Sequence, residues 1–119
     1  ARPQVPRRSG LDLVSGHAMP RQFTSFAEFY PFYLGEHSNR SSRRLHFVGT
    51  SLFVLQWLLA LPLGLPLLWL TGPLTGYAFA WVGHFFFERN RPATFSHPIY
   101  SLIGDFAMAR DMLRGRIPW

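Results

Sequence analysis

The sequence predicts an all-α membrane protein, in which a hairpin of two transmembrane or deeply inserted helices is flanked by two amphipathic interfacial helices. Every charged side chain of the 119 residues lies in residues 1–44 or 88–119, which leaves 43 consecutive residues, 45–87, without a formal charge. A spanning helix needs about 20 mainly apolar residues, so this stretch has room for two. Pro62, Gly64 and Pro66 fall near its middle, where a helix must kink or turn.

Residues 1–22 are predicted to form a disordered leader. They hold three prolines and four arginines and show no sustained periodicity. Met19 offers a native start, in which case residues 1–18 do not belong to the fold. We therefore expect one helical membrane domain over residues 23–115, followed by a tail over 116–119.

The first interfacial helix is predicted to begin at Thr24 or Ser25, either of which can cap it, and to run for about 10 residues. Gly35 offers a stop. Its aromatic residues recur at spacings of three and four: Phe26, Phe29, Tyr30 and Tyr33.

The hairpin is predicted as a first helix over residues 43–61, a turn or short re-entrant piece over 62–72 and a second helix over 73–88. A second interfacial helix is expected over residues 99–113, because apolar residues recur there on one stripe, and Gly115 and Pro118 would end it. All twelve basic residues are arginine and lie outside the uncharged stretch 45–87, which places both termini on the cytoplasmic side of a membrane, the inner membrane if the chain is bacterial.

Composition excludes several kinds of chemistry. The chain has no cysteine, so disulfides, thiolate ligands and cysteine nucleophiles are all ruled out. It has no lysine, so a Schiff base and a phosphate-loop lysine are ruled out as well. No basic-aromatic module for nucleic acid is present, and the arginines are better suited to anionic lipid.

Four of the five histidines are predicted to meet at one end of the hairpin. In a hairpin folded back near Leu65, His46 faces His84, and His37 and His97 belong to the same end. Gly76, Ala80, His84 and Glu88 lie four residues apart on one stripe of the second helix, which turns His84 toward the partner helix. Neutral imidazoles with a carboxylate and no cysteine are typical ligands of non-haem Fe(II), although zinc accepts them too.

Other interpretations remain open at this point. His46 and His84 suit the axial positions of a b-type haem, and the hairpin suits a non-catalytic membrane protein. Glu88 suits an ion pair with Arg89, Arg91 or Arg44 as well as it suits a metal. Because two short helices bury little surface, we also expect a dimer or larger assembly.

Two blocks of sequence resemble a family of membrane 2-hydroxy fatty acid dioxygenases. The blocks are FYLGEHSNRSSRRLHFVGTSL and GYAFAWVGHFFFERNRPATFSHPIYSLIGDFAMARDML, and the resemblance covers roughly residues 26–113. It implies Fe(II)-dependent α-oxidation, in which a 2-hydroxy fatty acid and O₂ yield a fatty acid one carbon shorter. Membrane lipid and the hydroxy acid would then be the partners.

The resemblance also assigns residues. His37, His46 and His84 match the histidines of the two blocks and would hold the metal, with His97 as a further candidate. Glu88 and Asn39 would act in catalysis or support the ligands. The substrate carboxylate would be bound by Arg43, Arg44 or Arg91, and the acyl chain would lie among Phe53, Trp57, Phe79 and Phe85.

Overall fold

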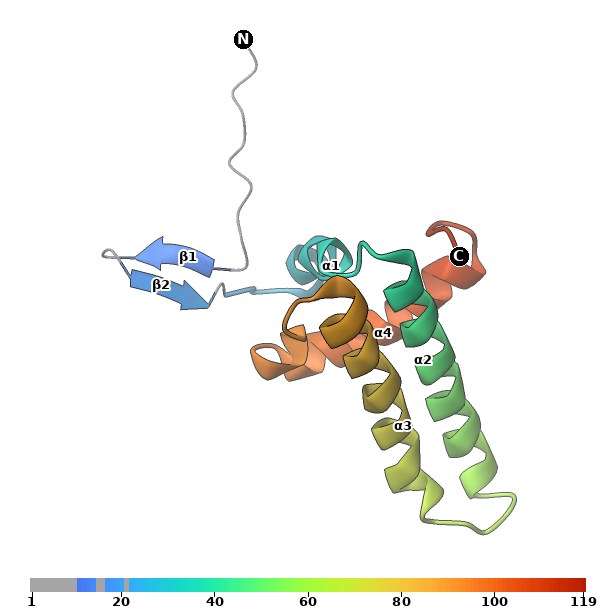
Figure 1. Cartoon of the computed structure of the whole chain (residues 1–119). Helices are drawn as coiled ribbons and strands as arrows, with labels where there is room; N and C mark the ends of the chain where they lie inside the picture. Colours follow the sequence, from blue (N-terminus) through green and yellow to red (C-terminus); the bar gives the residue numbers. More distant parts are fainter. Residues whose placement is uncertain (1–10, 15–16, 21) are drawn as a thin grey trace.

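The computed structural model describes residues 11–14, 17–20 and 22–119. Two short antiparallel strands, β1 (Leu11–Val14) and β2 (His17–Pro20), come first, with Leu11 opposite Pro20. The rest of the described chain is helical (Figure 1). Its elements are α1 (Phe26–Gly35), α2 (Arg40–Ala60), α3 (Leu68–Val82), the π-helical turn η1 (Gly83–Glu88), the 3₁₀ turn η2 (Ala93–Phe95) and α4 (Pro98–Leu113). The predicted leader and domain bounds stay predictions, since residues 1–10, 15–16 and 21 lie outside the described residues.

Side chains cap the first two helices. The Ser25 hydroxyl accepts a hydrogen bond from the Glu28 N–H at 3.2 Å, and the Glu28 carboxylate accepts one from the Thr24 N–H at 3.1 Å. The first bond satisfies an N–H group that the first turn of a helix leaves free, and the second ties Thr24, the residue before the cap, to the same turn. Asn39 caps α2 in the same way, because its side-chain oxygen accepts from the Ser42 N–H at 3.1 Å.

Helices α2 and α3 lie side by side and antiparallel, joined by a turn over residues 61–67 (Figure 1). A Cβ placed on Gly49 of α2 would lie 2.6 Å from the Cβ of Phe79 on α3, so the two backbones approach more closely than any larger residue would allow. Farther along the pair, Gln56 accepts from the Thr71 hydroxyl at 2.6 Å and donates to Thr75 at 3.0 Å.

The prediction of a transmembrane or deeply inserted hairpin is wrong. Within residues 11–14, 17–20 and 22–119, no helix combines the length and the apolar character needed to cross a membrane. The uncharged stretch is divided by the turn at 61–67, which leaves residues 45–60 to α2 and 68–82 to α3. Each portion falls short of the roughly 20 apolar residues of a span. The expected location as an integral membrane protein of an inner membrane, with both termini cytoplasmic, rested on these spans and is wrong with them.

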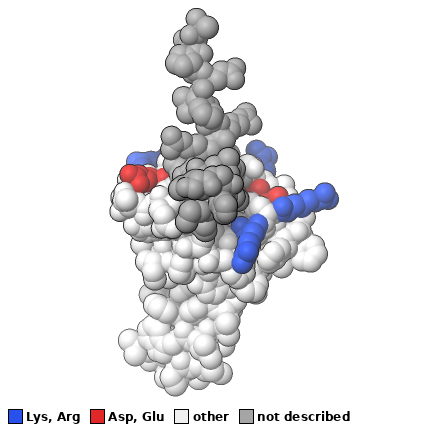
Figure 2. Space-filling model, turned by 90° about the vertical axis from the view of Figure 1, so that its left-hand side faces the viewer, with Lys and Arg blue, Asp and Glu red and all other residues white. Residues whose placement is uncertain are grey.

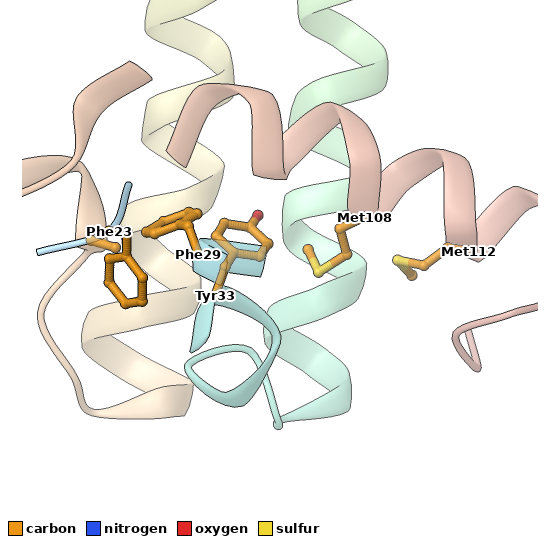
Figure 3. Packing of buried hydrophobic residues seen from close by; sticks show 6 residues of the cluster. Phe23, Phe29, Tyr33, Met108 and Met112 are labelled. Carbon is orange, nitrogen blue, oxygen red and sulfur yellow. The ribbon is translucent and has the colours of Figure 1, made fainter. Parts of the chain in front are cut away.

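The prediction of two amphipathic interfacial helices is wrong as well, because α1 and α4 pack against each other in one core. Figure 3 shows rings of α1 lying against a methionine of α4. This cluster is the hydrophobic core near the base of the hairpin, and it contains Phe23, Phe29, Tyr33, Ala93, Met108 and Met112. On α1 the predicted aromatic face supplies buried Phe29 and Tyr33, whereas on α4 most of the predicted apolar stripe, including Ile99, Ile103 and Leu113, is exposed and Met108 and Met112 make the packed face.

Charge and apolar surface are segregated along the molecule. In Figure 2 the charged side chains gather around the end that carries α1, and the opposite, narrow end shows none. That narrow end is the turn of the hairpin, where Leu58, Leu61 and Leu67 are each more than half exposed. The histidines thus lie at the charged base of the hairpin.

Replacing Gly49 should destabilise the fold. Gly49→Ala puts a methyl group against Phe79 and should lower the free energy of unfolding by about 1–3 kcal/mol, the usual effect of overpacking. Denaturant unfolding followed by circular dichroism measures this change. Gly35→Ala is the matched control, because a Cβ there meets nothing within 4 Å. Equal stability of the two variants would contradict the close packing of α2 on α3.

Candidate metal centre

Three histidines from separate parts of the chain converge at the base of the hairpin. His37 follows α1, His46 lies in the second turn of α2, and His84 lies in η1. The Nε2 atom of His46 is 3.0 Å from Nε2 of His37 and 3.2 Å from Nε2 of His84. All three residues are buried, and their ligand atoms lie within 4.8 Å of one another.

The other ring nitrogen of each histidine is held by an oxygen acceptor. The Nδ1–H of His37 donates to the carbonyl of Tyr33 at 2.6 Å, and that of His46 donates to the carbonyl of Ser42 at 2.8 Å. Carbonyl oxygens accept only, so Nδ1 must carry the proton in both rings. Each histidine bonds the carbonyl four residues before it, so both anchors follow from helical geometry.

His84 is anchored by a side chain. Its Nδ1 lies 2.6 Å from Oδ1 of Asn90, while the amide nitrogen of Asn90 donates at 2.9 Å to both the carbonyl and the carboxylate of Glu36. Those two bonds orient the Asn90 amide, so its oxygen faces His84 and Nδ1 is again the donor. Anchors of this kind orient histidine ligands in metal sites.

The anchors leave three Nε2 lone pairs aimed at a common point. With no proton on any Nε2, contacts of 3.0 and 3.2 Å cannot be hydrogen bonds, and the lone pairs repel one another. A cation at this point removes the repulsion. Three neutral imidazoles form a recognised set for zinc or non-haem iron, so the donor set fits a metal ion.

The turn η1 presents His84 to α2. A Cβ on Gly83 would lie 2.8 Å from Oγ of Ser42 and 3.2 Å from the His46 ring, so only glycine lets the backbone pass here. Arg89 then takes a left-handed conformation with φ 55° and ends the turn. Single π-helical turns of this kind are frequent at functional sites.

Burial keeps the three rings neutral. It lowers the pKa of His46 to about 4 and holds the pKa of His37 well below its usual range, where the neighbouring His46 and His84 lower it further. Burial also lowers the pKa of His84. At neutral pH the rings therefore have free lone pairs for a metal.

Helix α4 forms the wall opposite the histidines. The Tyr33 ring stacks on His37 with centroids 4.0 Å apart, and its hydroxyl donates to Oδ1 of Asp105 at 2.5 Å. Burial raises the pKa of Asp105 to about 7. Asp105 and Ser101 line a cavity together with the three histidines, and its volume of about 10 Å³ is close to the space of one water molecule.

The structure places Glu88 and Asn39 beside the centre, outside the histidine cluster. Oε1 of Glu88 accepts from the Asn39 N–H at 2.7 Å, and Oε2 lies 3.4 Å from the Ser38 hydroxyl. Glu88 thereby ties the end of η1 to the start of α2. A catalytic part for either residue stays a prediction.

The remaining candidates are not gathered at the cluster. His97 contacts Ser96 and lies edge-on to Phe23. Arg43 donates to the carbonyl of Ser38 at 2.8 Å, and Arg44 donates to that of Trp119 at 3.4 Å. The part predicted for these arginines in carboxylate binding stays a prediction.

Arg91 and the four predicted acyl-chain residues are spread over several places. The Arg91 guanidinium lies 4.7 Å over the Phe95 ring, and both line an open basin with Phe85. Phe53 and Trp57 pack edge to face at 5.0 Å on α2. Phe79 lies against Gly49. That Phe53, Trp57, Phe79 and Phe85 together line an acyl-chain pocket stays a prediction.

The sequence alone did not single out Tyr33, Asn90, Ser101 or Asp105 as residues of the site. Ser101 and Asp105 are four residues apart on a predicted helix, a spacing that places them on one face. That spacing was the signal available, since nothing in the sequence indicates which helix faces the histidines.

Comparison with known proteins adds to this geometry. The sequence model of the Mpo1-like family, described as 2-hydroxy-palmitic acid dioxygenase Mpo1-like, matches residues 23–117. The chain belongs to this family. No curated protein and no solved structure matches the Mpo1-like chain.

The family match confirms the resemblance drawn from the two sequence blocks. The family description names a dioxygenase and a 2-hydroxy fatty acid. In this Mpo1-like chain the matched residues include all three histidines of the cluster and the α4 wall. The histidine cluster is therefore a group within the family-matched residues that could hold a metal ion.

Removing any ligand should abolish metal binding. The wild type should hold one metal ion per chain, and His37→Ala, His46→Ala and His84→Ala should each weaken metal affinity by at least about a hundredfold. Asn90→Ala should weaken it less, by about tenfold, because the ring loses its anchor and keeps its nitrogen. Elemental analysis after dialysis against a chelator series gives the affinities. His97→Ala is the control, and full metal retention in His84→Ala would disprove the cluster as the site.

The stability of the metal-free protein should fall as the pH falls from about 6.5 to about 4. In this window an unfolded histidine binds a proton that folded His46 does not, so unfolding is favoured, by up to about 3 kcal/mol for this one residue. Denaturant unfolding at pH 7 and at pH 4.5 gives the change in the free energy of unfolding between the two pH values. This change should be smaller in His46→Gln than in the wild type. Asp105 acts in the opposite direction but is present in both proteins and cancels. Identical pH dependence in both would contradict a buried neutral His46.

Proposed function

We propose that the chain is an Fe(II)-dependent dioxygenase that converts 2-hydroxy fatty acids into fatty acids one carbon shorter by α-oxidation, with O₂ as co-substrate. The observation that carries the proposal is the convergence of three unprotonated Nε2 atoms in a chain of the Mpo1-like family. Iron is proposed over zinc because oxidation by O₂ needs a redox-active metal.

The protein residues supply binding, orientation and shielding. His37, His46 and His84 would hold the ion, and three ligands leave coordination positions open for substrate and O₂. Bound iron would supply the redox chemistry toward O₂ and polarise the hydroxy acid. Because all three histidines are buried, they would shield a bound ion from bulk water.

The ring anchors contribute to the same activity. Backbone carbonyls of Tyr33 and Ser42 and the amide of Asn90 hold each imidazole in one orientation, so little reorganisation is needed when the metal binds. The water-sized cavity beside the ligands leaves room for a small group at the centre.

The haem alternative has less support. Axial ligands of a haem lie on opposite faces of the macrocycle, whereas Nε2 of His46 and Nε2 of His84 are only 3.2 Å apart, and Nε2 of His37 is 3.0 Å from that of His46. Zinc fits the ligands equally well, and a non-catalytic protein would also tolerate a bound ion. Both are outcomes of the experiment below.

An activity assay on iron-loaded protein tests the proposal. Purified protein loaded with Fe(II) and supplied with 2-hydroxypalmitate and O₂ should release pentadecanoic acid, detected by mass spectrometry. Omission of O₂ or replacement of iron by zinc should abolish the product.

Variants connect any product to the cluster. His84→Ala should lower turnover by at least about a hundredfold, whereas the control His97→Ala should retain it. Turnover of Glu88→Gln is compared with that of Arg91→Gln. A much larger loss in Glu88→Gln would indicate that the Glu88 carboxylate acts beyond tying η1 to α2, whereas equal, mild losses would indicate that it does not. Absence of product from fully iron-loaded protein would refute the proposal for this substrate.

A further inference from the structure

Two polar side chains of α4 face the three histidines across the cavity. Ser101 and Asp105 are one helical turn apart and both line the space that His37, His46 and His84 enclose. From α3 and the segment 92–94, the cavity is lined by Ala80, Trp81, Pro92, Ala93 and Thr94. Polar groups are thus concentrated on the α4 side of the cavity.

Both side chains have hydrogen-bonding capacity to spare. The Ser101 hydroxyl is buried, with the residue 4% exposed, and has no hydrogen-bond partner within the described part of the chain. Asp105 accepts from Tyr33 through Oδ1 only, which leaves Oδ2 without a described partner. A buried hydroxyl without a partner costs free energy, so such a group beside a cavity indicates a ligand that satisfies it.

Three separate hollows between this wall and the surface share lining residues, and the first two are each about 10 Å³, the space of one water molecule. Asp105 lines both the histidine cavity and a second, inner cavity beside Phe53. Thr50 and Phe106 line that inner cavity and also an apolar groove between α2 and α4. The remaining walls of the groove are mainly aliphatic, which suits a hydrocarbon chain that enters from outside.

We propose that Ser101 and Asp105 bind the head of the 2-hydroxy acid, with Asp105 accepting a hydrogen bond from the 2-hydroxyl and Ser101 donating one to the carboxylate. The inference rests on the function proposed above and assigns its substrate recognition. Asp105 then determines specificity for the hydroxyl, Ser101 contributes affinity for any fatty acid, and the acyl chain lies in the α2–α4 groove. A site that must satisfy a hydroxyl discriminates strongly against the analogue that lacks it.

Ligand binding without turnover tests this assignment. Zinc-loaded protein is titrated with 2-hydroxydecanoate and with decanoate by calorimetry, so the result does not depend on catalysis. The wild type should bind the hydroxy acid at least about tenfold more tightly than decanoate. Asp105→Leu should remove this preference, because an apolar side chain can neither accept a hydrogen bond from the 2-hydroxyl nor donate one to it.

The serine variant has a different expected result. Ser101→Ala should weaken binding of both acids equally, by about tenfold, and so keep their ratio. Asp111→Asn is the matched control: Asp111 lies on the same helix and accepts from Tyr30 at 2.7 Å, but it does not line the cavity. The control should behave as the wild type.

The outcomes separate this inference from the proposed function. Equal affinity of the wild type for the two acids, or an unchanged ratio in Asp105→Leu, would overturn the inference even if the protein is an active dioxygenase. A hydroxyl preference that depends on Asp105 would support it even if no pentadecanoic acid forms. Since the two acids are compared on one protein at a time, a general loss of stability cannot change their ratio.

Discussion

The candidate centre depends on three outward hydrogen bonds. Because the Nδ1–H of each histidine is committed to an oxygen acceptor, each Nε2 carries a lone pair, and three lone pairs meet within 4.8 Å. Because burial keeps the rings neutral, protonation does not relieve the repulsion between these lone pairs. An arrangement that is unfavourable without a cation and favourable with one is what a metal site requires.

The rest of the fold serves to bring these three rings together. The close approach of α2 and α3 at Gly49 sets the distance between the helices, and Gly83 lets η1 pass against α2. The core of α1 and α4 then fixes Tyr33, which both accepts from His37 and stacks on it. One aromatic residue thus joins the hydrophobic core to the ligand cluster.

Much of this could be predicted from residue spacing. The proline and glycine residues near the middle of the uncharged stretch predict a hairpin turn, and a turn near Leu65 places His46 opposite His84. The membrane spans could not be judged in this way, because a stretch without charge measures composition, whereas a span depends on where each helix begins and ends. The turn over residues 61–67 and the end of α3 at Val82 leave helical apolar segments shorter than the uncharged stretch suggested.

The sequence by itself determined the donors: with no cysteine, five histidines are the nitrogen ligands on offer, and their spacing about one turn brings His46 and His84 to the same end. Only the tertiary structure decided that His37 joins them while His97 lies apart, that Glu88 ties two elements together, and that Ser101 and Asp105 face the cluster. The physical reason is that spacing describes one helix or one symmetric hairpin. The position of α4 instead follows from packing of Met108 and Met112 in one core with Phe29 and Tyr33 of α1, while most of the apolar stripe that the sequence shows on α4 stays exposed.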